Sequence, residues 1–145
     1  MLSIHFPEPN FRIKTEAGKE YLFDPVRKKW LLLTEEEWVR QNFVRYLVEV
    51  CSYPAALVAM EKQIRLGELT KRFDILVYDG DHQPWLMVEC KQMSVPMAEE
   101  VLHQALRYNL ALPVRFIVIT NGRETFGWEK IDGGLQPLQS LPAHS

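Results

Sequence analysis

The chain has few cysteines and no long apolar segment, and each shortage excludes a class of protein. Its 145 residues include two cysteines, Cys51 and Cys90, without the C-x-x-C spacing of zinc or redox sites. We therefore expect both to be small core residues in a reducing compartment. No segment approaches the roughly 18 apolar residues that span a bilayer, and the N-terminus lacks the basic and then apolar pattern of a secretion signal. These features predict a cytoplasmic protein.

Net positive charge and two familiar catalytic motifs are also missing. A formal net charge of −2 does not favour tight nucleic-acid binding, because that affinity depends largely on phosphate neutralisation. The sequence has no G-x-x-x-x-G-K-[ST] phosphate loop, which excludes an ATP-driven motor within this polypeptide. It has no G-x-S-x-G nucleophile elbow, and its four histidines show no ligand spacing. With 47% hydrophobic and 25% charged residues, the chain matches a globular domain with one core.

Charged residues inside two apolar runs are the most informative feature that is present. Asp74 lies in the run 72–78, and Glu89 and Lys91 lie in the run 85–91. Charged side chains are rarely buried unless they are paired or bind a metal, and strand alternation puts Glu89 and Lys91 on one face. If the runs pair as a hairpin across 79–84, two carboxylates and one ammonium can converge, as phosphodiester hydrolysis with a divalent metal requires. The alternative is a surface ion pair on an edge strand, but consecutive apolar residues favour central strands.

A helix predicted over 94–110 supplies the next candidates. It has a proline near its start and acidic residues in its first turn. Gln104 falls on an apolar stripe with Met97, Val101, Ala105 and Tyr108. An unpaired buried amide costs on the order of 1–3 kcal/mol, so we expect Gln104 to bond the charged residues of the strands or, alternatively, a backbone carbonyl. A second stripe of leucines on the opposite side leaves open which face of this helix meets the sheet.

These residues resemble a known family. Asp74, then Glu89-Cys90-Lys91, then Gln104 and Tyr108 spaced as Q-x-x-x-Y, resemble the PD-(D/E)XK nuclease superfamily in its RecB-like branch. Residues from about 20 to 130 are most similar to the N-terminal nuclease domain of type I restriction enzyme R subunits, through the segments 34–41, 71–74, 89–91, 104–109 and 120–122. The chain departs from the pattern at Phe73, where such nucleases often have proline. The resemblance implies an α/β fold with an αβββαβ core, in which helices flank a central mixed sheet.

The resemblance also implies roles for individual residues. Asp74, Glu89 and the backbone carbonyl of Cys90 would hold Mg²⁺, with Mn²⁺ as a substitute. Lys91 would orient or deprotonate the attacking water. The residues that would position Lys91, the water or the DNA backbone are Gln104 and Tyr108.

Other candidates are less specific. Glu61 resembles a glutamate that relatives place beside the metal, but it could equally face solvent as a cross-strand partner of Lys71. Basic residues available to contact DNA are Lys71, Arg72 and Arg107. DNA is the expected partner, together with motor and specificity subunits of a restriction complex. The alternative function is a DNA-binding or complex-assembly module that keeps the fold without catalysing a reaction.

Local patterns complete the expected architecture. We expect one domain over 1–131, including an N-terminal extension (1–33) whose hairpin pairs 11–14 with 20–23, and a flexible tail over 132–145. Thr34 and Glu37 form a capping box for a helix that runs to about Cys51. Further strands are expected at 58–64, 114–120 and 125–131, the last two joined by a two-residue turn at Asn121-Gly122. The basic run 27–29 is expected to be a solvated loop.

Overall fold

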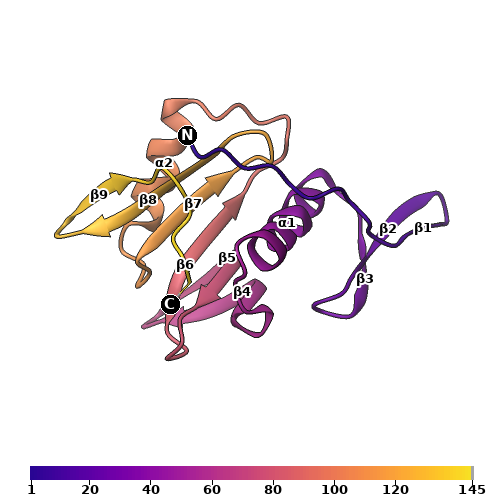
Figure 1. Cartoon of the computed structure of the whole chain (residues 1–145), viewed down its shortest axis with the longest axis horizontal. Helices are drawn as coiled ribbons and strands as arrows, with labels where there is room; N and C mark the ends of the chain where they lie inside the picture. The colour runs from indigo at the N-terminus through magenta and orange to yellow at the C-terminus, as the bar shows by residue number, and fades with distance from the viewer. Residues whose placement is uncertain (145) are drawn as a thin grey trace.

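A six-stranded mixed sheet between two helices forms the centre of the protein (Figure 1). The structure, a computed structural model, describes residues 1–144. In spatial order the strands are β4 (Val58–Leu66), β5 (Leu69–Tyr78), β6 (Pro84–Cys90), β7 (Phe116–Thr120), β8 (Thr125–Ile131) and β9 (Gly134–Pro137). Strands β6 and β7 are parallel, and every other neighbouring pair is antiparallel. With helices α1 (Glu35–Arg45) and α2 (Glu99–Asn109), the order α1-β4-β5-β6-α2-β7 confirms the expected αβββαβ core.

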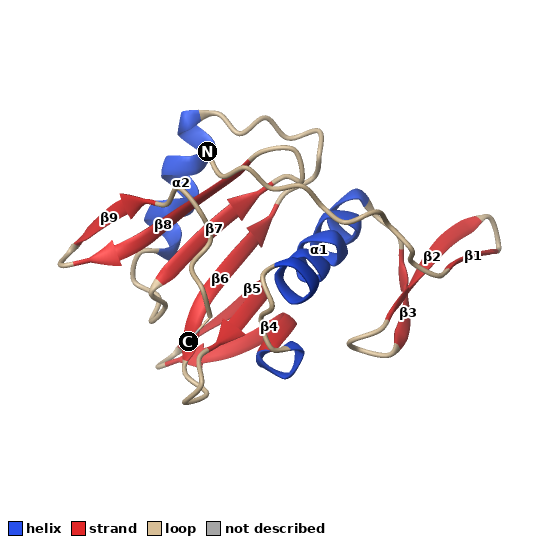
Figure 2. Ribbon diagram, in the orientation of Figure 1, coloured by secondary structure: helices blue, strands red, loops and turns tan. Residues whose placement is uncertain are grey.

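Helix α1 covers one face of the sheet (Figure 2). The Thr34 hydroxyl accepts a hydrogen bond from the backbone N–H of Glu37 at 3.0 Å, which confirms the cap. The helix continues as a π-helical segment over Tyr46–Val50, so its expected end near Cys51 is also confirmed. Its buried stripe is Val39, Phe43 and Leu47, which pack on the inward residues of β5, β6 and β7. None of the helices among residues 1–144 is long and apolar enough to cross a membrane.

Helix α2 covers the opposite face of the sheet, but with a different stripe from the expected one. It begins at Glu99 rather than near 94, and its buried residues are Leu102, Ala105 and Asn109. Gln104 is exposed and lies at the edge of this stripe. The second core therefore forms mainly between Leu102, Ala105 and the apolar side chains of β5, β6 and β7. The sequence left open which of two stripes meets the sheet, and the buried face lies between them, about one residue further along the helix than the stripe through Gln104.

A second, smaller sheet lies beyond α1, away from the main sheet (Figure 1). It consists of β1 (Ile13–Glu16), β2 (Lys19–Asp24) and β3 (Lys29–Leu32), all antiparallel. The expected N-terminal hairpin is confirmed. Its turn residues Ala17 and Gly18 have φ of 52° and 78°, the positive values that a two-residue turn requires.

Two expectations for the C-terminal part differ from the structure. The loop between β7 and β8 has four residues, because the Asn121 carboxamide oxygen accepts hydrogen bonds from the backbone N–H groups of Arg123 and Glu124. The expected flexible tail contains β9, which extends the sheet beside β8. Leu138 and Leu141 then pack against the core on the α1 side, which gives this segment an apolar anchor.

Candidate functional site

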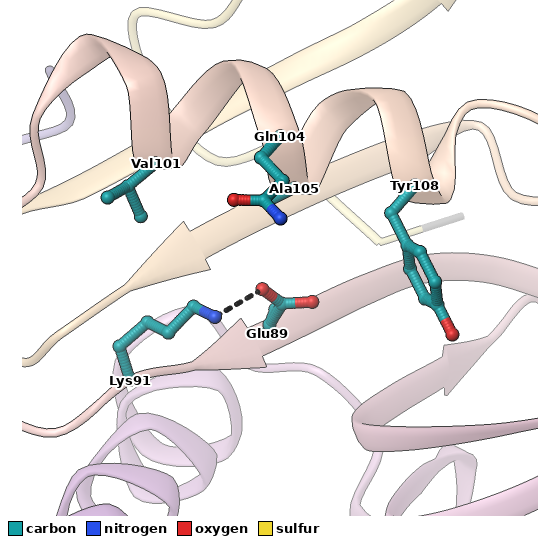
Figure 3. Close-up of a pocket in the computed structure, with 6 residues that line it drawn as sticks. All are labelled: Glu89, Lys91, Val101, Gln104, Ala105 and Tyr108. Carbon is teal, nitrogen blue, oxygen red and sulfur yellow. Dashed lines mark ion pairs between the residues drawn. The ribbon is translucent and has the colours of Figure 1, made fainter.

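A cleft of about 280 Å³ lies between the end of β6 and helix α2 (Figure 3). Its lining is Glu89, Lys91, Val101, Gln104, Ala105 and Tyr108. Glu89 is the next to last residue of β6, and Lys91 follows the strand directly. Strand alternation puts their side chains on one face, as the sequence predicted, and both line the cleft. The Lys91 ammonium lies 3.1 Å from Glu89 Oε2. The cleft thus contains a carboxylate and an ammonium in direct contact.

Asn109 is a member of this site that was not among the residues predicted from the sequence. Its side-chain amide donates to Glu89 Oε1 at 3.4 Å and to the carbonyl of Ala105 at 2.8 Å. The residue is fully buried, and its Oδ1 atom has no hydrogen-bond partner among the described residues. These contacts fix one side of the Glu89 carboxylate and leave the other to Lys91. A detectable signal was present, because Asn109 lies one helical turn after Ala105 on the buried face.

Gln104 and Tyr108 stand at the rim of the cleft. The Gln104 amide points from α2 towards Glu89 (Figure 3). Tyr108 is 70% exposed, and the Lys71 ammonium of β5 lies 4.1 Å from the centroid of its ring. This cation–π contact connects β5 to α2 at the mouth of the cleft. Arg107 is exposed on α2 and is not among the residues that line the cleft.

Asp74 lies in β5 close to the end of β6, but it is not one of the residues that line the cleft. The β5–β6 ladder pairs Ile75 with Val88, and Asp74 lies immediately beyond the end of that ladder. Its Oδ2 accepts a hydrogen bond from the backbone N–H of Cys90 at 2.8 Å, and its Oδ1 accepts from Arg40 Nη2 of α1 at 3.2 Å. The structure therefore brings Glu89, Lys91, Gln104 and Tyr108 together, whereas Asp74 contacts the Cys90 peptide and α1 and does not line the cleft.

A buried guanidinium organises a second group of charges around Asp74. The Arg40 side chain is 5% exposed. It donates to Glu37 Oε1 at 2.8 Å, to Glu36 Oε1 at 2.8 Å and to Asp74, and it lies 3.5 Å from Glu61 Oε1. Four carboxylates thus share one internal cation, and Asp74 is neutralised by α1 rather than by Lys91.

Arg27 and Glu61 extend this network, and both differ from their expected places. The predicted solvated loop is wrong for Arg27, which pairs with Asp24, Glu37 and Glu61. Glu61 Oε2 also pairs with Arg72 at 2.9 Å, so its cross-strand partner is not Lys71.

The backbone at Glu61 is irregular. The register passes from Met60↔Ile75 to Lys62↔Phe73, and Glu61 has a φ of 50°, in the left-handed region that side chains rarely adopt. This local conformation stands opposite Asp74, outside the regular ladder.

The charges shift several pKa values in opposite directions. Burial, followed by the negative charge of Asp74, raises the pKa of Glu36. Burial also disfavours the charged form of Glu61, but the cations of Arg40, Arg72 and Arg27 outweigh it and lower the pKa of that carboxyl. Complete burial, followed by the charge of Asp74, raises the pKa of the Cys90 thiol well above its ordinary value. Cys90 therefore offers the site its backbone groups and not a thiolate.

The carboxylates of Glu89 and Asp74 are the donor groups near Cys90 that could hold a divalent metal. Among residues 1–144, no three His, Cys, Asp or Glu side chains form a ready metal-binding group. Mg²⁺ needs fewer, since it keeps several waters and usually takes one or two carboxylates together with substrate phosphates. Glu89 faces the cleft, and Asp74 bonds the next peptide along the chain. Two carboxylates next to the Cys90 peptide fit a hydrated Mg²⁺ in their chemistry, and Glu89 is better placed than Asp74 because it faces the cleft.

Comparisons with known proteins give one matching family. The profile of the family described as type I restriction enzyme R protein N terminus (HSDR_N) matches residues 35–142. A solved structure described as "cryoEM structure DrdV-DNA complex" is similar over 72% of this chain, with 17% sequence identity and a TM-score of 0.48. This chain spans 10% of the chain in that structure. No curated protein gave a significant match.

Proposed function

Because the chain belongs to the family of type I restriction enzyme R protein N-termini, we propose that it is a Mg²⁺-dependent endonuclease domain that hydrolyses DNA phosphodiester bonds. The observation that carries the proposal is the contact between Lys91 and Glu89 in an open cleft beside α2. A partly buried carboxylate that can hold a metal, paired with an ammonium at the end of a strand, is suited to act on a phosphate ester. The metal and the ammonium would both offset the negative charge that develops on the phosphate. Mn²⁺ would substitute for Mg²⁺.

The metal would be held by Glu89, Asp74 and the backbone carbonyl of Cys90. Glu61 is a further candidate, and its carboxylate lies within ion-pair distance of three arginines. Bound there, Mg²⁺ would supply a Lewis acid for the phosphate oxygens. Asn109 holds Glu89 in position through its amide hydrogen bond. This contact gives the main carboxylate of the cleft a fixed orientation before any substrate arrives.

Lys91 is the residue to which we assign the chemistry. Its ammonium can donate hydrogen bonds to the attacking water and to a phosphate oxygen, and it offsets negative charge as the phosphorus gains a fifth ligand. After deprotonation it could also accept the proton of the water. Gln104 and Tyr108 lie across the cleft mouth and would position the DNA strand or the water (Figure 3). Lys71, Arg72 and Arg107 would contact the DNA backbone outside the cleft.

Plasmid nicking by the wild type and by Lys91→Ala tests the proposal. We expect the wild type to nick supercoiled plasmid with Mg²⁺ or Mn²⁺, and Lys91→Ala to be silent while it still binds the metal in calorimetry, because no metal ligand is lost. Arg115→Ala is a matched control, since it removes one exposed basic residue just before β7, at the other end of the strands. Nicking by Lys91→Ala at the wild-type rate would contradict the role of the lysine.

A second candidate function is a module that binds DNA or assembles a restriction complex without cutting. The observation that favours it is the bond between Arg40 and Asp74, which keeps one expected metal ligand on an internal cation. For this function, the wild type would fail to nick plasmid with either metal, both alone and with motor and specificity subunits. The same nicking experiment therefore separates the two functions.

A further inference from the structure

The outer face of the small sheet carries three aromatic rings and two basic side chains. Cross-strand register places Lys14 opposite Tyr21, and Phe23 opposite Trp30. Arg12 joins the same row, because its carbonyl accepts a hydrogen bond from the N–H of Phe23. Directly opposed residues share one face of a sheet. These five residues, Arg12, Lys14, Tyr21, Phe23 and Trp30, are called the aromatic face below.

The rest of the molecule does not cover the aromatic face. The opposite face of the same sheet supplies Leu22 and Asp24, which are fully buried, and Arg27 connects that side to Glu37 of α1. On the aromatic face the rings are half-buried and Arg12 is exposed. The small sheet therefore has one side for the fold and one side that remains available to a partner.

Cations and rings are interleaved on this face. The Arg12 guanidinium lies 5.0 Å from the Phe23 ring centroid and 5.4 Å from that of Trp30. The Lys14 ammonium lies 4.6 Å from the Trp30 centroid and 6.0 Å from that of Tyr21. Rings that can stack on bases, with cations that can reach phosphates, are the combination by which proteins bind single-stranded nucleic acid. Bases of a duplex are stacked on each other and cannot use such rings.

The charge distribution agrees with a polyanionic partner. Residues 1–33 contain six Lys and Arg against four Asp and Glu, a net charge of +2, while the rest of the chain contains eleven against fifteen, a net charge of −4. A groove of about 240 Å³ beside the aromatic face is lined in part by Phe11, Arg12, Phe23 and Arg45. The N-terminal region is thus the basic part of an acidic protein, and a groove runs along its aromatic residues.

We propose that the aromatic face binds single-stranded DNA, with bases stacked on Phe23 and Trp30 and phosphates at Arg12 and Lys14. This deepens the proposed function, on which the choice of DNA rests, by adding a second contact surface outside the cleft. Such a surface would hold an unpaired stretch of the substrate next to the nuclease core. Binding at this face needs no metal, so it can be measured separately from cleavage.

The test is fluorescence anisotropy with a labelled single-stranded oligonucleotide and its duplex, in EDTA, over a salt series. Arg12→Gln/Lys14→Gln should weaken single-strand binding about tenfold, and should reduce the slope of log K against log salt by about 1.4, because each contact to a single strand contributes about 0.7. Trp30→Leu should weaken single-strand binding about tenfold or more. Arg115→Gln/Arg123→Gln removes two exposed charges elsewhere and should change neither quantity.

Each outcome decides the proposal. Loss of single-strand affinity in the Arg12/Lys14 variant but not in the Arg115/Arg123 variant supports it, even if the wild type cuts no DNA. Equal losses in both variants, equal wild-type affinity for the duplex, or no single-strand binding would overturn it, even if the wild type nicks plasmid. Trp30 also packs on Phe23, so circular dichroism and melting of Trp30→Leu accompany the titration. If that variant is misfolded, the two charge variants are sufficient to support or overturn the proposal.

Discussion

Arg40→Met should strongly destabilise the protein, because it removes the cation shared by four carboxylates. The Arg40 and Glu37 side chains are 5% and 8% exposed and lie 2.8 Å apart. Removing one partner of a buried ion pair typically costs about 3–5 kcal/mol, since it leaves an uncompensated charge. Glu37 keeps hydrogen bonds from Arg27 and Gln41, and methionine refills most of the volume of the arginine stem, so we expect the lower end, about 3 kcal/mol. The buried Nε of Arg40 has no hydrogen-bond partner among the described residues. Its removal relieves an unsatisfied donor and so also lowers the cost of the substitution.

Urea unfolding followed by circular dichroism measures this free energy, and Arg45→Met is the matched control. Arg45 lies on the same helix and pairs with Glu49, whose side chain is 51% exposed. Exposed pairs of this kind contribute about 0–1 kcal/mol. The two variants should therefore differ by about 2 kcal/mol in the free energy of unfolding. Equal losses would show that the Arg40 network behaves as a surface ion pair and would refute the reasoning.

Two further predictions concern metal and pH. In a thermal melt, Mg²⁺ or Mn²⁺ should raise the melting temperature of the wild type by mass action. The metal should raise it less in Asp74→Ala and in Glu89→Ala. Equal shifts in all three proteins would argue against both residues as metal ligands. The pKa of Glu61 is lowered, so its contribution to stability is present above the ordinary pKa of glutamate and is lost as pH falls through the pKa of the folded state. The pKa of Glu36 is raised, so its contribution is present below the ordinary pKa of glutamate and is lost as pH rises through the pKa of the folded state. Urea unfolding across pH should accordingly show Glu36→Gln more stable than the wild type at neutral pH and Glu61→Gln less stable, and the opposite order would contradict the two shifts.

The parts of the fold that follow from local patterns could be predicted from the sequence. Thr34 marks the start of α1, and the apolar runs around Asp74 and Glu89 mark β5 and β6 as central strands. The pairing of Glu89 with Lys91 also follows from a local rule, because residues two apart in a strand share a face. The tail could not be predicted in this way, since β9 depends on pairing with β8 rather than on its own composition.

The helix beside the cleft shows where periodicity stops being sufficient. Two apolar stripes on α2 were compatible with the sequence, and the structure buries a face between them that contains Leu102, Ala105 and Asn109. That rotation exposes Gln104 at the rim and turns Asn109 towards Glu89. A shift of one residue, about 100° around a helix, thus changes which amide supports the carboxylate. Only packing against the sheet fixes such a rotation.

The position of Asp74 depends on a contact that no local pattern contains. Arg40 and Asp74 are 34 residues apart, and the bond between them exists because α1 crosses the sheet where the β5–β6 ladder ends. The motif predicts Asp74 as a metal ligand, whereas the fold pairs its carboxylate with Arg40. A divalent metal that takes Asp74 as a ligand would share this carboxylate with the guanidinium of Arg40, which bonds its Oδ1 atom. In the proposed function, metal binding at the cleft is therefore coupled to α1 through a single hydrogen bond.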